Sequence, residues 1–513
     1  LTLISKNPTL SRRRLDISVV LPECSRIIEK VMAIREGLTF DDVLLLPRHS
    51  AVFSRKDVST KVSLSRHLSI NIPLISANMD TVTESSMARA MSRMGGIGII
   101  HRFLSVERQT EEVRRVKRAE NVIIEDPFTV YPDMTLGEAK SFMRREGTSG
   151  VLVVKVKAGR KQLAGILTRR DLLFETDDRQ KVSSLMSKKL VTARPDISLE
   201  KAKNILHNYR IEKLPLTTKD GYLVGLITLK DIVERMQNPT SSKDKKGRLM
   251  VGAAVGVKED TLARTDALLK AGADVIVIDV AHGHNSRAVE MTKLLRKTFG
   301  SKIEIIAGNI ATPEAARDLV KAGADGLKVG IGPGAACTTR IVTGVGVPQL
   351  TAIIDVAKEA KKLSIPFIAD GGVKNSGDLA KALAAGADTV MIGNLLAGTK
   401  ESPGEYILER GIAYKYYRGM ASYEASAEKT RIDGSVALGG QADGFFRSPE
   451  GASGRVPYRG EASMVVTDLV SGLRSSMSYL GARTLSEFQK NAEFIRQTLA
   501  GITESGPHGV RVS

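Results

Sequence analysis

The chain has 513 residues, a formal net charge of +19, a hydrophobic content of 42% and two cysteines, Cys24 and Cys337. No apolar run is long enough to cross a bilayer, and two cysteines exclude a disulfide framework, so we expect a cytoplasmic protein without a membrane partner. The positive charge would suit nucleic acid, but zinc-finger spacings and aromatic-studded basic strands are missing. We therefore expect a surface for phosphorylated small molecules and no nucleic-acid function.

The N-terminal segment differs in composition from the rest. Residues 1–31 contain Arg12, Arg13 and Arg14 and few acids, as in a transit peptide or an upstream extension of the reading frame, and we expect them to be disordered. Residues 32–120 then read as the first part of a main domain. They hold candidate strands at 72–76 and 97–100 and a helical pattern at 85–94 between them.

Residues 121–238 contain an internal repeat, with one copy at about 123–180 and a second at about 183–238. Thr135 and Ser198 are expected N-caps of the helix that follows in each copy. The repeat resembles a tandem pair of CBS modules, often called a Bateman module. That resemblance implies regulatory purine nucleotides held by a Thr and an Asp three residues later in each copy: Thr168, Asp171, Thr228 and Asp231. The same spacing is that of a helix cap, and both roles can hold together.

A polar linker at 239–248 leads into an alternation of apolar strands and helices in residues 239–513. The expected strands are residues 275–279, 303–307, 326–329, 366–369 and 389–393. Helices between them end in Ala-Gly-Ala-Asp, starting at 271, 322 and 385, where the glycine is expected to end the helix. This rhythm predicts an α/β protein, a (β/α)₈ TIM barrel interrupted by the repeat.

Each of these strands is followed by a polar loop, and in a barrel such loops meet on one face as a functional site. The most informative loop is Gly330 to Arg340, which carries Cys337 among closely spaced glycines. A thiol there suits a nucleophile, although a tight turn with an inert cysteine is the simpler alternative. The late glycine-rich loops, Asp370-Gly371-Gly372 and Gly393-Asn394, suit a phosphate group.

The motifs together resemble the IMP dehydrogenase / GMP reductase family over residues 32–513. The resemblance is carried by Met79 to Glu84, the cysteine loop, Asp370 to Gly372, Tyr417 to Met420, Pro449 to Gly451, and Glu504-Ser505. It implies an active-site flap at about 421–455, IMP and NAD as substrate and cofactor, a potassium ion, and assembly into a homotetramer or octamer.

The resemblance also assigns roles by position. Cys337 would be the nucleophile that forms a covalent thioimidate with the purine, Thr339 would lie beside it, and Arg431 is our candidate for the arginine that activates water. Substrate would be held by Met79, Asp370, Gly371, Gly372, Gly393, Asn394, Tyr417, Gly419, Met420 and Glu450. Cofactor would be held by Asp279, Asn309, Gly330 and Gly332. Potassium would be held by Gly332, Gly334 and Cys337, with Glu504 of a neighbouring subunit and with Ser505, which follows it in the sequence.

The chain departs from the family pattern at three places. Ala335 replaces a serine that contacts phosphate, no Arg-Tyr pair occurs between Ser426 and Gly454, and Glu424 lies one residue beyond a glutamate used by GMP reductases. The leading prediction is an NAD-dependent IMP dehydrogenase in guanine nucleotide biosynthesis. The alternatives are an NADPH-dependent GMP reductase, which releases IMP and ammonia from GMP, and a weakly active purine-nucleotide sensor.

Overall fold

The computed structural model describes residues 34–119, 124–157, 159–230, 232–233, 238–432 and 448–507. Its centre is a closed barrel of eight parallel strands, which confirms the predicted TIM barrel. In barrel order the strands are β11 (Val251–Val255), β12 (Val275–Asp279), β13 (Ile305–Ile310), β14 (Gly326–Val329), β15 (Phe367–Asp370), β16 (Thr389–Ile392), β4 (Leu74–Ser76) and β5 (Ile97–Ile100).

The barrel joins the two parts of the chain that flank the repeat. On one side Ile75 of β4 lies opposite Met391 of β16, and on the other Ile99 of β5 lies opposite Gly252 of β11. Because these strands are buried on both faces, they are almost wholly apolar rather than alternating. Insertion of the repeat therefore leaves the barrel closed.

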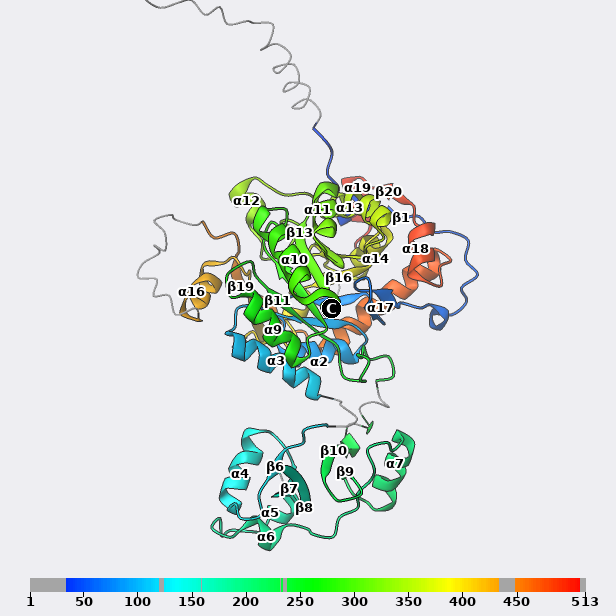
Figure 1. The fold of residues 1–513 in the computed structure, drawn as a ribbon. Coiled ribbons are helices and arrows are strands. Elements are labelled where there is room, and N and C mark those ends of the chain that lie inside the picture. Colours follow the sequence, from blue (N-terminus) through cyan, green and yellow to red (C-terminus); the bar gives the residue numbers. More distant parts are fainter. Residues whose placement is uncertain are drawn as a thin grey trace, which may run out of the picture.

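Helices cover the outside of the barrel (Figure 1). They are α2 (Ser85–Arg93), α3 (Val106–Arg118), α9 (Thr261–Ala271), α10 (Ser286–Phe299), α11 (Pro313–Lys321), α13 (Gln349–Leu363), α14 (Ser376–Ala384), α17 (Ala462–Tyr479) and α18 (Leu485–Asn491). Two short helices, α12 (Thr339–Thr343) and α15 (Asn394–Ala397), follow strands of the barrel. No described helix is both long and apolar enough to cross a membrane.

The three Ala-Gly-Ala-Asp motifs do more than end helices. Their glycines adopt positive φ, as expected. Each aspartate then accepts a backbone N–H from the strand that precedes its helix: Asp274 from Val251 at 2.7 Å, Asp325 from Ile305 at 2.9 Å and Asp388 from Phe367 at 2.9 Å. The repeated motif thus ties neighbouring strands together at their N-terminal ends.

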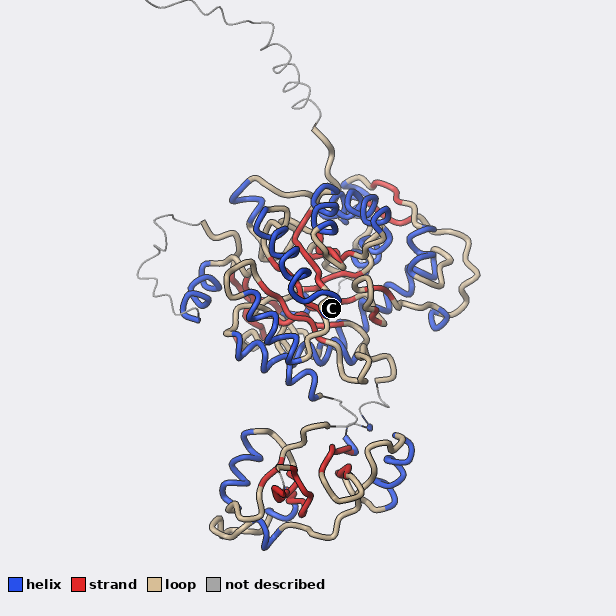
Figure 2. The backbone as a smooth tube through the Cα atoms, in the orientation of Figure 1, coloured by secondary structure: helices blue, strands red, loops and turns tan. Residues whose placement is uncertain are grey.

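The repeat forms two small units beside the barrel (Figure 2). The first contains β6 (Thr129–Val130), α4 (Leu136–Arg145), β7 (Gly150–Lys157), β8 (Arg160–Thr168), α5 (Arg169–Leu172) and α6 (Val182–Leu185). The second contains α7 (Leu199–Asn208), β9 (Lys213–Thr217) and β10 (Leu223–Thr228). Each unit has its own apolar cluster, and the predicted caps Thr135 and Ser198 are confirmed.

Smaller elements surround the barrel. Near the ends of the chain lie η1 (Phe40–Asp42), β1 (Val43–Leu45), β20 (Phe494–Arg496) and α19 (Leu499–Glu504), with β1 and β20 paired antiparallel. Between α15 and α17 lie β17 (Tyr406–Glu409), β18 (Ile412–Arg418), α16 (Tyr423–Ile432) and β19 (Ser453–Pro457), whose three strands form one sheet. Four short pieces, η2 (Arg55–Asp57), β2 (Val62–Ser63), β3 (Ser69–Ile70) and η3 (Gly300–Lys302), complete the main domain.

Candidate active site

Cys337 lies in the loop between β14 and α12, at the carboxyl ends of the strands where barrels place their chemistry. Its Sγ lies 3.2 Å from Thr339 Oγ1, and the cysteine is half-buried. Arg340 closes the loop by donating to the carbonyls of Ile331 and Val347. Burial lowers the pKa of Arg340, but the negative charge of Cys337 acts in the opposite sense.

The segment that precedes β19 is paired with the cysteine loop. Glu450 O accepts a hydrogen bond from Thr338 N at 2.9 Å, and Ala452 N donates to Ala336 O at 2.8 Å. Gly419 N in turn donates to Ala452 O at 2.9 Å. A Cβ on Gly419 would lie 2.8 Å from Ala336 O, so only glycine fits here without displacing the loop. Predicted residues Cys337, Gly419 and Glu450 are thus brought together.

A buried lysine that the sequence interpretation missed connects the neighbouring loops. Lys328, in β14, donates from Nζ to Asp370 Oδ2 at 2.8 Å, to Asp279 Oδ1 at 3.1 Å, and to Asn309 Oδ1. Burial disfavours its charge, but the two carboxylates outweigh this and raise the pKa of Lys328 to about 12. Asn309 also donates to Asp370 Oδ2 and to Gly330 O. Predicted residues Asp279, Asn309 and Asp370 therefore form one fixed polar cluster.

The glycines of the predicted phosphate side allow close approach of the backbone. Gly371 and Gly372 have φ of 93° and 85°, and a Cβ on Gly330 would lie 2.2 Å from Asp370 O. Gly393 precedes Asn394, the first residue of α15, and a Cβ on Gly393 would lie 3.4 Å from Met79 Sδ and from Tyr417 Oη.

Tyr417 packs into this corner, with its hydroxyl 3.8 Å from Met79 Sδ. Burial, followed by the negative charges of Asp370 and Cys337, raises the pKa of Tyr417, so its phenol stays protonated and can donate to an anion. This places Tyr417 and Met79 with the glycine loops.

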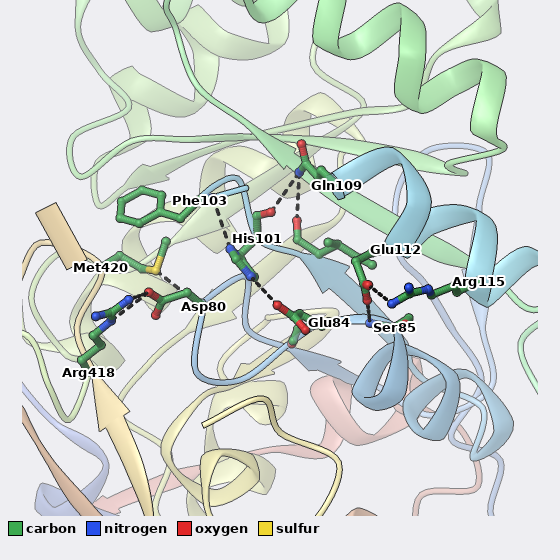
Figure 3. Close-up of polar contacts among 12 residues, drawn as sticks. Asp80, Glu84, Ser85, His101, Phe103, Gln109, Glu112, Arg115, Arg418 and Met420 are labelled. Carbon is green, nitrogen blue, oxygen red and sulfur yellow. Dashed lines mark hydrogen bonds and ion pairs between the residues drawn. The ribbon is translucent and has the colours of Figure 1, made fainter. Parts of the chain in front are cut away.

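An ion pair supports the other side of the site (Figure 3). Arg418 donates to Asp80 Oδ2 from Nε at 2.8 Å and from a terminal nitrogen at 2.5 Å. The backbone N–H of Asp80 points to Met420 Sδ at 3.3 Å. The Arg418–Asp80 ion pair fixes β18 against the loop after β4. It also keeps Met420, the predicted contact to the base, next to Asp80.

A second group missed by the sequence interpretation follows β5, in the sequence His101-Arg102-Phe103. His101 and Phe103 are labelled in Figure 3. His101 is buried and accepts the Phe103 N–H at Nδ1, 3.2 Å away, while its Nε2 lies 3.6 Å from Glu84 Oε1. Arg102 Nε lies 3.8 Å from Asp279 Oδ2. Burial raises the pKa of Asp279, but Lys328 and then Arg102 outweigh it and lower the pKa.

The structure does not bring every predicted residue to the cysteine. The Arg431 side chain is 82% exposed on α16 and pairs with Glu428 at 3.7 Å, so no described contact holds it in the water-activating position proposed from the sequence. Ser505 Oγ donates to Gln497 Oε1 and to Gly501 O at the end of α19, and Glu504 is the last residue of that helix; no described hydrogen bond joins either residue to Gly332 or Gly334 of the same chain.

The predicted regulatory residues form a cap in the first copy of the repeat. Asp171 Oδ2 accepts from Thr168 N at 2.8 Å and from Thr168 Oγ1 at 2.7 Å, which confirms the capping interpretation. In the second copy Thr228 ends β10 as expected, and Asp231 lies outside the described residues.

The chain was compared with known proteins. A family model described as IMP dehydrogenase / GMP reductase domain matches residues 37–508. The chain is 50% identical over 480 residues to an inosine-5'-monophosphate dehydrogenase of Nitrosopumilus maritimus, covering 93% of this chain and 99% of that protein. It is 50% identical over 486 residues to the protein of that name from Bacillus subtilis, covering 93% and 97%.

A solved structure is also similar. The crystal structure of a cysteine-to-alanine variant of GMP reductase from Trypanosoma brucei, in complex with guanosine 5'-monophosphate, superposes with a TM-score of 0.87 at 44% identity, covering 94% of this chain and 100% of that one. Both the match over nearly the whole length and the high identity show the relationship. The chain therefore belongs to the IMP dehydrogenase / GMP reductase family.

Proposed function

We propose that this protein is an IMP dehydrogenase that converts IMP, NAD and water to XMP, NADH and a proton. The observation that carries the proposal is the position of Cys337 at the catalytic end of the barrel, with Thr339 in contact with the sulfur. The relatives that are 50% identical over 93% of the chain support the dehydrogenase assignment.

The chemistry assigned to Cys337 is nucleophilic. The thiolate Sγ forms a bond to carbon 2 of the purine while the hydrogen on that carbon leaves with its electron pair, and water later displaces the sulfur. The Thr339 hydroxyl lies 3.2 Å from the sulfur and is thus close enough to orient it. The covalent intermediate separates the oxidation from the hydrolysis, so that one difficult conversion becomes two easier steps.

The phosphate and ribose would be held on the glycine side of the site. Gly371, Gly372 and Gly393 offer backbone N–H groups, Tyr417 offers a protonated hydroxyl, and Asp370 offers a carboxylate to ribose hydroxyls. Asn394 lies at the start of α15 beside them, and Met79, Gly419, Met420 and Glu450 would contact the base. Ala335 supplies no hydroxyl, so the backbone carries more of the phosphate binding.

Asp279, Asn309, Gly330 and Gly332 would hold NAD, which accepts a hydride when bound. The fit is supported by Arg102, whose Nε is buried and has no hydrogen-bond partner among the described residues, next to the Asp279 carboxylate. Such a pair can satisfy the hydroxyl and anionic groups of a dinucleotide.

A potassium ion would be held by carbonyls of Gly332, Gly334 and Cys337 with Glu504 and Ser505 of a second subunit. In one chain the Gly334 carbonyl accepts the Cys337 N–H at 3.0 Å, and the described contacts of α19 do not reach the loop. Binding of the ion thus depends on assembly into a homotetramer or octamer, which we also propose. We further propose that regulatory purine nucleotides bind at Thr168, Asp171, Thr228 and Asp231. The cysteine content favours the cytoplasm.

GMP reductase is the second candidate. It is favoured by the lack of an Arg-Tyr pair between Ser426 and Gly454 and by the exposed position of Arg431, because both affect only the hydrolytic step. The similarity to the Trypanosoma brucei GMP reductase also supports it. Purified protein should therefore be tested with IMP plus NAD for NADH absorbance, and with GMP plus NADPH for ammonia. Turnover of GMP plus NADPH alone would favour the reductase over the dehydrogenase. If neither substrate pair is turned over but the protein binds ATP or GTP, the sensor is favoured.

A further inference from the structure

The Phe103 ring lies within cation–π range of two cations from different parts of the fold. Arg102 Cζ is 5.2 Å from the ring centroid, and Lys429 Nζ of α16 is 4.9 Å from it. Phe103 is 7% exposed, so its ring offers the low-dielectric surroundings in which such contacts are strongest.

Hydrogen bonds within the loop after β5 fix the position of Phe103. Its backbone N–H is bound by His101 Nδ1, and the His101 carbonyl accepts a 3.0 Å hydrogen bond from Gln109 Nε2 (Figure 3). Gln109 also donates to Ala254 O in β11. The loop after β5 is therefore secured to the barrel wall, so any motion between the ring and Lys429 belongs to α16.

The second half of helix α16 depends on different contacts from the first. Glu424 accepts a hydrogen bond from Ser453 at 2.5 Å, which ties the first turn to β19. Ala425 is buried, while Tyr423 and Glu428 are exposed. The Lys429 contact lies five residues beyond the Glu424 hydrogen bond and is thus placed to determine how the second half of the helix docks.

The same ring holds the arginine that faces the cofactor side. Arg102 reaches Asp279 Oδ2 at 3.8 Å while its guanidinium lies by Phe103. The contacts run in series from Lys429 through Phe103 and Arg102 to Asp279. A change in the position of α16 can therefore alter the position of Arg102 beside Asp279.

We infer that Phe103 and Lys429 are positioning residues: their contact docks α16 on the barrel and keeps Arg102 oriented toward Asp279. This couples the helix that begins the flap to the dinucleotide side of the site. Only the expected effect on turnover rests on the proposed function. The docking of α16 can be measured without any substrate.

The test compares Lys429→Gln and Phe103→Leu with the conservative variants Lys429→Arg and Phe103→Tyr in the full-length protein. Hydrogen–deuterium exchange of a peptide covering residues 423–429 should quicken about three-fold in the first two and stay near the parent in the conservative pair. Combining Lys429→Gln with Phe103→Leu should add nothing to either single change. Glu428→Gln, on the same helix, is the matched control: it removes only the exposed 3.7 Å pair with Arg431 and should change exchange far less than Lys429→Gln.

In turnover assays Lys429→Gln and Phe103→Leu should each change KM for the dinucleotide about three-fold and leave KM for the purine nucleotide near the parent value. Unaltered exchange in Lys429→Gln, or additive effects of the two substitutions, would overturn the inference. If Phe103→Leu lowers the melting temperature, the comparison of Lys429→Gln with Lys429→Arg tests the inference alone, because Lys429 lies outside the core. Quickened exchange without any turnover would uphold the docking contact and count against the proposed function.

Discussion

The Lys328 ammonium donates a 2.8 Å hydrogen bond to Asp370 on the neighbouring barrel strand and, from the same nitrogen, reaches Asp279 two strands away in the other direction. One buried cation thus sets the position of both carboxylates. Lys328→Met would leave Asp370 without its buried counter-charge and Asp279 with Arg102 at 3.8 Å as its remaining cation, so we expect the free energy of unfolding to fall by about 3 kcal/mol. Denaturant unfolding measures this. Lys328→Arg keeps the charge and should recover most of the loss; equal losses in both variants would contradict the electrostatic account.

Cys337 can be tested independently of stability. Cys337→Ala should abolish turnover and leave IMP affinity nearly unchanged, because the phosphate and ribose contacts that we propose lie on other loops. Calorimetric titration measures the affinity. Mass spectrometry of the parent protein quenched during turnover should show a purine adduct on the peptide that contains Cys337, and residual turnover by the alanine variant would exclude covalent catalysis.

Gly419 tests the pairing between the cysteine loop and the segment before β19. In Gly419→Ala the new Cβ would lie 2.8 Å from Ala336 O and must displace it. We expect kcat to fall about ten-fold or more with little change in melting temperature, since the strain is local to the cysteine loop. Gly454→Ala is the matched control, because a Cβ there would meet nothing within 4 Å. Comparable kinetic losses in both variants would refute this role for Gly419.

Asp388 should make stability depend on pH. Removal from water raises its pKa from 3.8 to about 7, against the opposing hydrogen bond from Phe367 N–H. Because the folded state then holds a proton that the unfolded state has lost, stability falls as pH rises from about 4 to 7 and is constant above that range. Asp388→Asn keeps an acceptor for Phe367 and cannot ionise, so its melting temperature should exceed that of the parent at about pH 8 but not at about pH 4.5.

A matched control uses another copy of the same motif. Asp325 also accepts a backbone N–H, from Ile305, but it is paired with Arg296. Asp325→Asn should therefore lower the melting temperature at about pH 8, because it breaks an ion pair. An increase in both variants would show that the charge of Asp388 is not the cause.

Thr168 and Thr135 separate nucleotide binding from helix capping. Both belong to a capping box in the same unit, with Asp171 and Glu138 as the respective partners. Each Thr→Val change should cost about 1 kcal/mol of stability from the lost cap. If Thr168 also contacts a regulatory nucleotide, only Thr168→Val should weaken ATP or GTP binding in a calorimetric titration. Equal affinity in the two variants would leave Thr168 with the capping role alone.

Much of the architecture was predictable because the barrel strands are short, apolar and followed by recognisable loops. The strands predicted at 97–100, 275–279 and 326–329 agree with β5, β12 and β14 at both ends. The cysteine loop and the Asp370 loop were found because glycine and reactive side chains occur together there. These local signals do not depend on which strands become neighbours.

Lys328 was missed because a single lysine inside an apolar strand carries no information about its partners. Its role emerges only when the barrel brings Asp279 and Asp370 to either side. A charge in a strand that must be buried on both faces was the available signal. Arg431 was proposed from its position in the flap alone, and a helix that exposes it at 82% could not be inferred from sequence spacing.

The closure of the barrel has a consequence for how the protein is made. Ile75 finds its partner Met391 only after the whole repeat and six further strands have left the ribosome. Until then the outer edge of β4 stays unpaired in the nascent chain, and the outer edge of β5 waits for β11, while the repeat, with its own two cores, can already fold. Synthesis of this enzyme therefore exposes its earliest strands to aggregation for longest, and a chaperone that shields them would act before the active site exists.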